Sequence, residues 1–405
     1  MRTIILACAL LSVTLPIPAQ PPFWVGSWAS SQQIPEPRNA LATDDLRDAT
    51  LRQVVHLSAG GSSVRVYLSN AFGAAPLHLT SVHIARPVAA ASPAIQSGTD
   101  RALTFHASPD VTIPAGAGYL SDALDYAVEP GADLAISMHL DLPPEPQTGH
   151  PGSRATSYLV HGDAVSDVDL PAARKVEHWY QLAAVDVAAA SETASIVVLG
   201  DSITDGHGAT TDGNDRWPDV LARRLRRFGV LNQGIGGNHL LSDGLGPGAL
   251  ARFDRDVLAQ TGVHYVLLLE GVNDLGGLAR SAEVSAAAHS ALVERVIAAY
   301  EQLIARAHAH RLRIIGCTIL PYLGSEYYHP GAASEEDRQA VNVWIRAHGH
   351  FDAVVDFDRV VRDPANAGHL LKQFDSGDHL HPSPAGYAAM ANAVPLSLFK
   401  TQRKH

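Results

Sequence analysis

The apolar pattern of the chain changes once, near residue 190, and this change limits the folds that the chain can adopt. Before it, short segments alternate apolar and polar residues between turn-forming Gly, Pro, Asn and Asp. In SSVRVYLSNAF (62–72), for example, Val64, Val66 and Leu68 fall on one face. Similar segments follow at 76–85, 133–142, 157–163 and 180–187. This pattern predicts an antiparallel β-sandwich, jelly-roll-like, over residues 22–187.

A small, polar stretch, AAASETAS (188–195), reads as the junction, and the pattern beyond it is different. Continuous apolar runs at 196–199, 263–269, 312–320 and 352–357 alternate with helical segments, most clearly at about 283–310. Such runs predict an α/β domain over residues 193–400, in which helices cover both faces of a parallel sheet. Sheets of this type bind ligands at the carboxyl ends of their strands. We therefore expect the functional residues at those ends.

Residues 1–20 have the composition of a secretory signal peptide. Arg2 precedes the apolar stretch from Ile4 to Leu15, and the small residue Ala19 offers a cleavage site next to Gln20. A buried first helix is the alternative. The run is shorter than the roughly 20 residues that span a bilayer, so we expect no membrane anchor. The sequence thus predicts a secreted or periplasmic protein.

The net charge argues against one class of partner, and the cysteine content argues against stabilisation by disulfides. The formal net charge of −11 argues against a nucleic-acid partner, which would require a basic face. Cys317 is the one cysteine outside the signal segment, so an internal disulfide is excluded there. Because Cys317 lies in a strand-like run, we expect a buried, inert thiol.

The first strand of the second half ends at Gly200-Asp201-Ser202. Gly200 permits a sharp turn, and a helix that starts after it would direct backbone N–H groups at a developing negative charge. The alternative is that Asp201 and Ser202 only cap this helix. The sequence lacks the Gly-x-Ser-x-Gly elbow, because Thr204 occupies the position of the second Gly. The segment alone therefore leaves open whether Ser202 is a nucleophile.

A serine nucleophile needs a base, and the base needs an orienting group. The segment DSGDHLHPSPAGY (375–387) places Asp378 three residues before His381, within reach of a tight turn. Ser383 and Pro384 predict the start of a helix that would anchor this turn. His379 competes for the role of base, and spacing alone does not exclude it.

Two more loops follow strand-like segments and offer hydrogen-bond donors. NQGIGGN (232–238) provides the backbone N–H of Gly237, and EGVNDL (270–275) provides the side-chain amide of Asn273. With the N–H of Ser202 they would make three donors for an oxyanion. Each loop is also compatible with a simple turn. A dinucleotide-binding fingerprint is excluded because His239 stands where the third Gly belongs.

Taken together, these four segments resemble the four sequence blocks of the SGNH hydrolases, also called the GDSL esterase/lipase family. The matching residues are GDSI (200–203), the Gly of NQGIGGN, the Asn of EGVND and the Asp-x-x-His of GDHLHP. The resemblance implies a flavodoxin-like α/β/α domain that hydrolyses carboxylic esters without metal or cofactor. It places the nucleophile on Ser202, the base and its partner on His381 and Asp378, and the oxyanion hole on Ser202, Gly237 and Asn273. It also selects His381 over His379. Gly237 fits the block by its distance from Asn232, with Gly236 as the alternative.

The first half is only loosely similar to the β-sandwich that precedes some secreted SGNH esterases. We expect it to shape the rim of the active site or to stabilise the fold. Trp24 and Trp28 are expected in its core or at an interface rather than on a sugar-binding surface. The expected substrate is a small-molecule or polysaccharide ester with a short acyl group, such as acetyl. The alternatives are a broad carboxylesterase or lipase, a glycan-binding protein with an inactive hydrolase half, and a histidine-based metal hydrolase.

Overall fold

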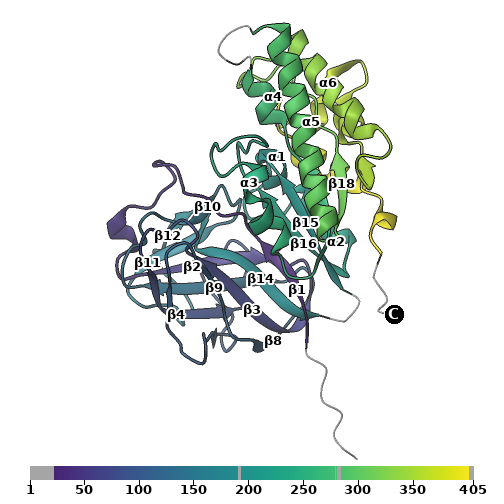
Figure 1. Ribbon diagram of the computed structural model, residues 1–405. Coiled ribbons are helices and arrows are strands. Elements are labelled where there is room, and N and C mark those ends of the chain that lie inside the picture. The colour runs from purple at the N-terminus through teal and green to yellow at the C-terminus, as the bar shows by residue number, and fades with distance from the viewer. Residues whose placement is uncertain (1–21, 190–192, 279, 281–283, 401–405) are drawn as a thin grey trace, which may run out of the picture.

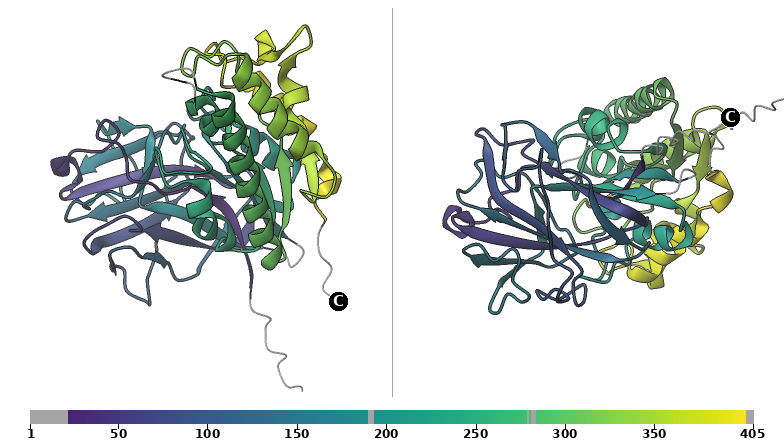
Figure 2. Two further views of the ribbon diagram at one scale, coloured as in Figure 1. Left: turned by 45° about the horizontal axis from the view of Figure 1, so that its top comes forward. Right: turned by 90° about the horizontal axis from the view of Figure 1, so that it is seen from below.

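The computed structural model describes residues 22–189, 193–278, 280 and 284–400 of the chain. The predicted signal segment, residues 1–20, lies outside the described residues. Within them, no helix combines the length and the apolar character needed to cross a membrane. The two predicted halves lie side by side, the first built of strands and the second of helices around a sheet (Figure 1 and Figure 2).

The first half is a sandwich of two antiparallel sheets, as the alternating pattern predicts. One sheet has the order β1-β14-β3-β7, with β8 beside β3, and the other has the order β12-β11-β2-β9-β4-β5, with β6 beside β4. A short pair, β10 and β13, lies outside both. Val64, Val66 and Leu68 are fully buried in the core between the sheets. The strands are β1 (Phe23–Ala29), β2 (Ala49–His56), β3 (Gly61–Ser69), β4 (Leu77–Ala85), β5 (Arg101–Ala102), β6 (Val111–Ile113), β7 (Gly118–Leu120), β8 (Leu124–Val128), β9 (Asp133–Leu140), β10 (Gly149–Pro151), β11 (Ser157–His161), β12 (Arg174–Val176), β13 (His178–Tyr180) and β14 (Leu182–Ala189).

The second half is built on a parallel sheet of order β16-β15-β17-β18-β19. Its strands are β15 (Ala194–Gly200), β16 (Phe228–Gly234), β17 (Val263–Leu269), β18 (Arg313–Cys317) and β19 (Ala353–Val355), and a hairpin of β20 (Arg362–Asp363) and β21 (Asn366–Leu370) follows. The helices are α1 (Ser202–Asp205), α2 (Trp217–Arg224), α3 (Ala249–Phe253), α4 (Val272–Leu278), α5 (Ala286–Ala309), α6 (Ala332–Arg346), α7 (Phe357–Val361) and α8 (Pro384–Ala393). Helices α5 and α6 pack together (Figure 1), and so do α2 and α8. The sheet is buried because helices cover it, which explains its continuous apolar strands.

The structure changes the predicted junction and agrees with the expectation for Cys317. The junction is shorter than AAASETAS, because β14 extends to Ala189 and β15 begins at Ala194. Cys317 lies at the end of β18 as a buried free thiol, and burial raises the pKa of that thiol. Its position fits the expected structural role.

The sandwich covers one edge of the parallel sheet. Strand β1 packs against β16, and a side chain at Gly229 would collide with the backbone oxygen of Gly26, 1.8 Å from the position of its Cβ. The hydroxyl of Ser58 accepts a hydrogen bond from the β16 amide of Val230 at 2.8 Å. The hydroxyl of Ser195 bonds to the carbonyl of Gly26 at 3.2 Å. Polar groups of this sheet edge are thus satisfied by the other half.

Candidate active site

Ser202 is placed by the turn from β15 into α1. Asp201 is the N-cap of α1, and its carboxylate accepts a hydrogen bond from the amide of Ile203 at 2.9 Å. Gly200 has no room for a side chain, because a Cβ there would lie 2.1 Å from the hydroxyl of Thr204. Asp201 therefore caps the turn, and Ser202 is the first residue of the helix, at the carboxyl end of the sheet.

The structure brings Ser202, His381 and Asp378 together in series. Oγ of Ser202 lies 2.8 Å from Nε2 of His381, and Nδ1 of His381 lies 2.6 Å from Oδ2 of Asp378. Because the carboxylate accepts, the ring proton belongs on Nδ1, which leaves Nε2 free to accept the serine proton. The other carboxylate oxygen, Oδ1, accepts the amides of Leu380 and His381 at 3.0 and 2.8 Å. The series is the arrangement that nucleophilic catalysis by serine requires.

The pKa of Asp378 is held below its ordinary value. Partial burial alone would raise this pKa, but the hydrogen bonds and charge of His381 and the backbone amides outweigh burial. Asp378 therefore stays ionised at the pH values at which proteins are usually assayed. His379, the competing histidine, lies in the same turn but pairs with Asp375, its Nδ1 2.6 Å from the carboxylate. Geometry thus agrees with the choice of His381.

A cavity of about 640 Å³ opens beside Ser202 and His381. Gly236, Gly237 and Asn273 lie in its wall, so the predicted oxyanion residues meet at one place. Gly237 has a φ of +68°, which favours glycine. Within the described residues, the amides of Ser202, Gly236 and Gly237 donate to no other group. The choice of Gly237 over Gly236 stays a prediction.

Several buried polar residues hold these loops, and the sequence reading missed them. Asp274, next to Asn273, accepts the amides of Leu240 and Leu241 at 2.7 and 3.0 Å and so fixes the Gly237 loop to α4. The buried guanidinium of Arg252 donates to the carbonyls of Gly200 and Gln233 at 3.0 and 2.6 Å. It also pairs with Glu270 at 3.3 Å. Its pair with Asp256, four residues on, is local, but Gly200, Gln233 and Glu270 come from three other segments, so the sequence does not mark Arg252 as part of the site.

Three buried carboxylates lie under the site, and burial raises the pKa of each. Burial raises the pKa of Asp201 to about 7, and the negative charge of Asp274 adds to the rise. Burial and the charge of Asp201 raise the pKa of Glu270 well above its ordinary value, against the effect of Arg252. Burial likewise raises the pKa of Asp274. Ionising this cluster destabilises the folded state.

We expect Asp201→Asn to stabilise the protein at pH 8 more than at pH 4.5. An acid whose pKa is raised on folding keeps its proton in the native state while the unfolded chain loses it. Its contribution to stability therefore falls as pH rises from about 4 to 7. Asn keeps the capping oxygen but does not ionise. Thermal melts of both proteins at the two pH values measure the difference.

Asp356→Asn is a control for which the opposite pH dependence of stability is expected. It caps α7, and although burial alone would raise its pKa, its bonds to Arg346 hold that pKa below the ordinary value. Asp356→Asn should therefore destabilise most at pH 8 and least in acid. If Asp201→Asn changed the melting temperature equally at both pH values, the expected pH dependence would be contradicted.

A second histidine, His207, lies against the triad. Its ring centroid is 4.1 Å from that of His381, and its Nε2 is 3.7 Å from Oδ2 of Asp378. Burial, followed by the charges of His381 and Arg154, lowers the pKa of His207 to about 4. Within the described residues, His207, Asp378 and His381 place three metal-binding atoms within 4.8 Å of one another. Two of these side chains are already bonded in the triad, so a metal would have to displace that bond.

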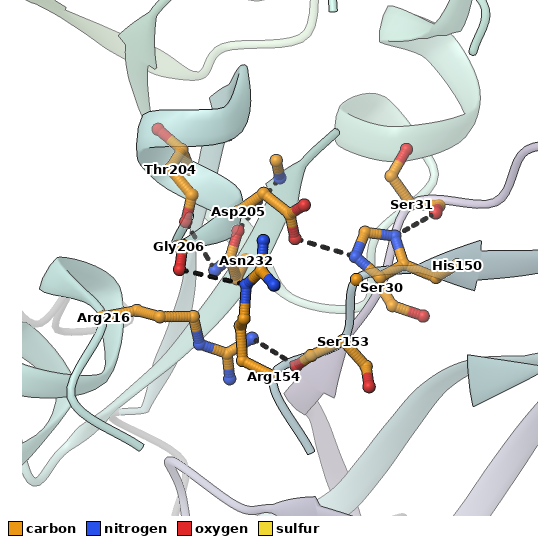
Figure 3. A network of polar contacts seen from close by, with 12 residues as sticks. Ser30, Ser31, His150, Ser153, Arg154, Thr204, Asp205, Gly206, Arg216 and Asn232 are labelled. Carbon is orange, nitrogen blue, oxygen red and sulfur yellow. Dashed lines mark hydrogen bonds and ion pairs between the residues drawn. The ribbon is translucent and has the colours of Figure 1, made fainter. Parts of the chain in front are cut away.

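The sandwich contacts the turn that follows the nucleophile (Figure 3). His150, on β10, lies 2.8 Å from Asp205 at the end of α1, and both side chains are nearly inaccessible, 3% and 5% exposed. Arg154 donates to the carbonyl of Gly206 at 3.2 Å and to Nδ1 of His207 at 3.3 Å. Arg38, also from the sandwich, reaches the wall of the cavity. The first half thus both shapes the rim and supports the loop that carries Ser202.

The two tryptophans considered for sugar binding differ in burial. Trp28 is buried and packs edge-on against Trp179, with ring centroids 4.8 Å apart. Trp24 is half-buried and partly covered by the guanidinium of Arg65, 4.4 Å from its ring centroid. Trp28 thus has the expected core role.

Comparison with known proteins agrees with this geometry. The model of the GDSL-like lipase/acylhydrolase family matches residues 198–389, which contain Ser202, Gly237, Asn273, Asp378 and His381. No curated protein sequence matches the chain.

Solved structures are similar to about half of the chain. One is a protein from Desulfitobacterium hafniense assigned to the lipolytic G-D-S-L family, with 23% identity over 49% of this chain and 96% of that one and a TM-score of 0.38. A GDSL-like lipase from Bacteroides thetaiotaomicron has 19% identity over 49% and 84%, with a TM-score of 0.37. An aryl esterase from M. smegmatis has 15% identity over 49% and 95%, with a TM-score of 0.37.

The family match carries the assignment, and it confirms the resemblance seen in the four sequence blocks. The second half of the chain is a domain of the GDSL-like lipase/acylhydrolase family, and the protein is a carboxylic ester hydrolase.

Proposed function

We propose that the protein is an exported serine esterase that removes short acyl groups, acetyl above all, from carbohydrates. The observation that carries the proposal is the series Ser202–His381–Asp378, with heavy-atom distances of 2.8 and 2.6 Å, at the wall of a cavity. The proposal takes the amides of Ser202 and Gly237 and the side chain of Asn273, residues that line this cavity, as the donors to a tetrahedral oxyanion.

In the proposed mechanism, Nε2 of His381 takes the proton of Ser202 as Oγ attacks the ester carbonyl. The carbonyl oxygen becomes an oxyanion and accepts hydrogen bonds from the three donors. His381 then gives its proton to the leaving alcohol, and the acyl group stays on Ser202. Water loses a proton to His381, attacks the acyl-enzyme and releases the carboxylic acid. Asp378 keeps the imidazole in the right tautomer and stabilises its charged form.

The cavity wall supports a sugar as the alcohol portion of the ester. Tyr327 lines it and is half-exposed, although Arg280 covers one face of its ring, 3.8 Å from the ring centroid. The phenol hydroxyl and the neighbouring guanidinium suit the hydroxyl groups of a sugar. Arg38, Glu326 and His379 supply charged or polar groups at the same wall.

A panel of substrates tests the proposal. Acetate release from acetylated xylan and hydrolysis of p-nitrophenyl esters from acetyl to dodecanoyl should be measured with wild type and with Ser202→Ala as blank. We expect kcat/KM to fall as the acyl chain grows and acetate to be released from the polysaccharide. Efficient cleavage of long chains without release from xylan would favour a broad carboxylesterase or lipase. An intact protein that no serine-directed phosphonate labels would favour the glycan-binding alternative.

A further inference from the structure

Asn273 is held by a tyrosine from a distant loop. Tyr328 lies between β18 and α6, it is buried, and its hydroxyl contacts Oδ1 of Asn273. Nδ2 of Asn273 donates to the carbonyl of Asn238 at 2.6 Å. A carbonyl only accepts, so this bond fixes which end of the amide faces Asn238, and Oδ1 must face Tyr328. The tyrosine therefore acts as the donor to Asn273.

The two bonds use one N–H and the oxygen of the Asn273 amide, which leaves its second N–H for the cavity. We propose that Tyr328 is a positioning residue for the oxyanion hole and that it holds the Asn273 amide with this second N–H directed at the reacting carbonyl oxygen. The inference rests on the proposed function. Tyr328 acts through Asn273 and is not itself assigned a contact with the reacting atoms.

The packing around Tyr328 points to the same role. Gly276 lies three residues after Asn273 on α4, and a Cβ at Gly276 would lie 2.6–2.8 Å from atoms of the Tyr328 ring. The missing side chain thus lets the ring lie directly on the helix that carries Asn273. On another side the ring of Tyr327 packs edge-on, with centroids 4.7 Å apart. Burial raises the pKa of Tyr328, so its hydroxyl keeps its proton.

Tyr328→Phe removes the hydroxyl but keeps the ring. Complete loss of one oxyanion donor typically lowers kcat by roughly 10²–10³-fold. In Tyr328→Phe the Asn273 amide is still present but free to rotate, so the decrease should be smaller. We expect kcat to fall about 10-fold, with KM changed less than about 2-fold. The matched control is Tyr322→Phe. Tyr322 is buried in the same segment, 6.3 Å from Tyr328 between ring centroids, and its hydroxyl has no partner in the described part of the chain. This control should stay within about 2-fold of wild type.

A double-mutant cycle with Asn273→Ala distinguishes positioning from general stabilisation. If Tyr328 acts through Asn273, Tyr328→Phe should leave kcat unchanged in the Asn273→Ala background. An equal loss in both backgrounds would overturn the inference, and so would a wild-type kcat for Tyr328→Phe alone. An active Asn273→Ala enzyme would overturn the oxyanion role of Asn273 and, with it, the role of Tyr328. The esterase proposal itself is tested separately by the Ser202→Ala blank.

Gly276→Ala offers a second route to the same measurement. The added methyl group must displace the Tyr328 ring, and Ala favours helix formation over Gly, so α4 itself should not weaken. We expect kcat to fall as in Tyr328→Phe, again with no further loss in the Asn273→Ala background. A Gly276→Ala enzyme with wild-type kcat would show that the ring can move without effect, against the proposal.

Discussion

Ser202→Ala should lower kcat by roughly 10⁵–10⁶-fold, the largest effect that we expect from a single substitution. Without Oγ, His381 has no proton to take and no acyl-enzyme can form, although the oxyanion donors remain. His381→Ala should be similarly severe, and Asp378→Ala milder. Hydrolysis of p-nitrophenyl acetate under saturating conditions gives kcat, and a thermal melt shows that the fold is kept.

Ser325 supplies the matched control for Ser202. It lines the same cavity and is buried, but its hydroxyl has no hydrogen-bond partner in the described part of the chain, so no base can take its proton. Ser325→Ala should therefore stay within about 3-fold of wild type. Residual activity of Ser202→Ala near that of Ser325→Ala would remove Ser202 from the mechanism, and wild-type activity of Asp378→Ala would do the same for Asp378.

His150→Ala should destabilise the protein by about 3–5 kcal/mol, because it leaves the buried carboxylate of Asp205 without its partner. Nδ1 of His150 donates to the carbonyl of Ser31 at 2.8 Å, and Nε2 faces Asp205 at 2.8 Å. Within the described residues, His150 is the only hydrogen-bond partner of the Asp205 side chain. Chemical unfolding of both proteins at one pH measures the loss.

His78→Ala is the control for this pair, because His78 and Asp141 lie 2.9 Å apart at the surface, with side chains 36% and 41% exposed. Its loss should cost about 0–1 kcal/mol. Asp205→Asn should recover part of the stability in the His150→Ala background, since a neutral amide costs less to bury than a lone carboxylate. Equal effects of His150→Ala and His78→Ala would show that water reaches Asp205 and compensates.

The sequence predicted those parts of the site that depend on local chemistry. Ser383 caps α8 through the amide of Gly386 with Pro384 at the first position, as the segment after His381 predicts. Ser202 stands at a strand end because an apolar run stops at a glycine. The roles of Ser202, Asp378 and His381 came from the family blocks, and the structure adds that the three side chains are in contact.

What the sequence could not provide depends on contacts between distant segments. Strand β2 was missed because it is buried on both faces and carries Thr50, Arg52 and Gln53, so it shows no alternation. Arg52 is accommodated there because its guanidinium donates hydrogen bonds to the hydroxyl of Ser137 and to the carbonyls of Pro93 and Asp167. The bonds of His150 to Asp205 and of Tyr328 to Asn273 likewise join residues with no shared local pattern.

Gly229 has a consequence for how such a protein can diversify. The backbone oxygen of Gly26 would lie 1.8 Å from a Cβ at position 229, so the hydrolase half needs a glycine there, whereas a Cβ at Gly26 would meet only the end of the Leu231 side chain. A hydrolase half with an ordinary residue at position 229 could not hold this sandwich at the same distance. The close approach of the two halves is therefore fixed by the hydrolase strand, and substitutions at Gly26 should be accommodated more easily than substitutions at Gly229.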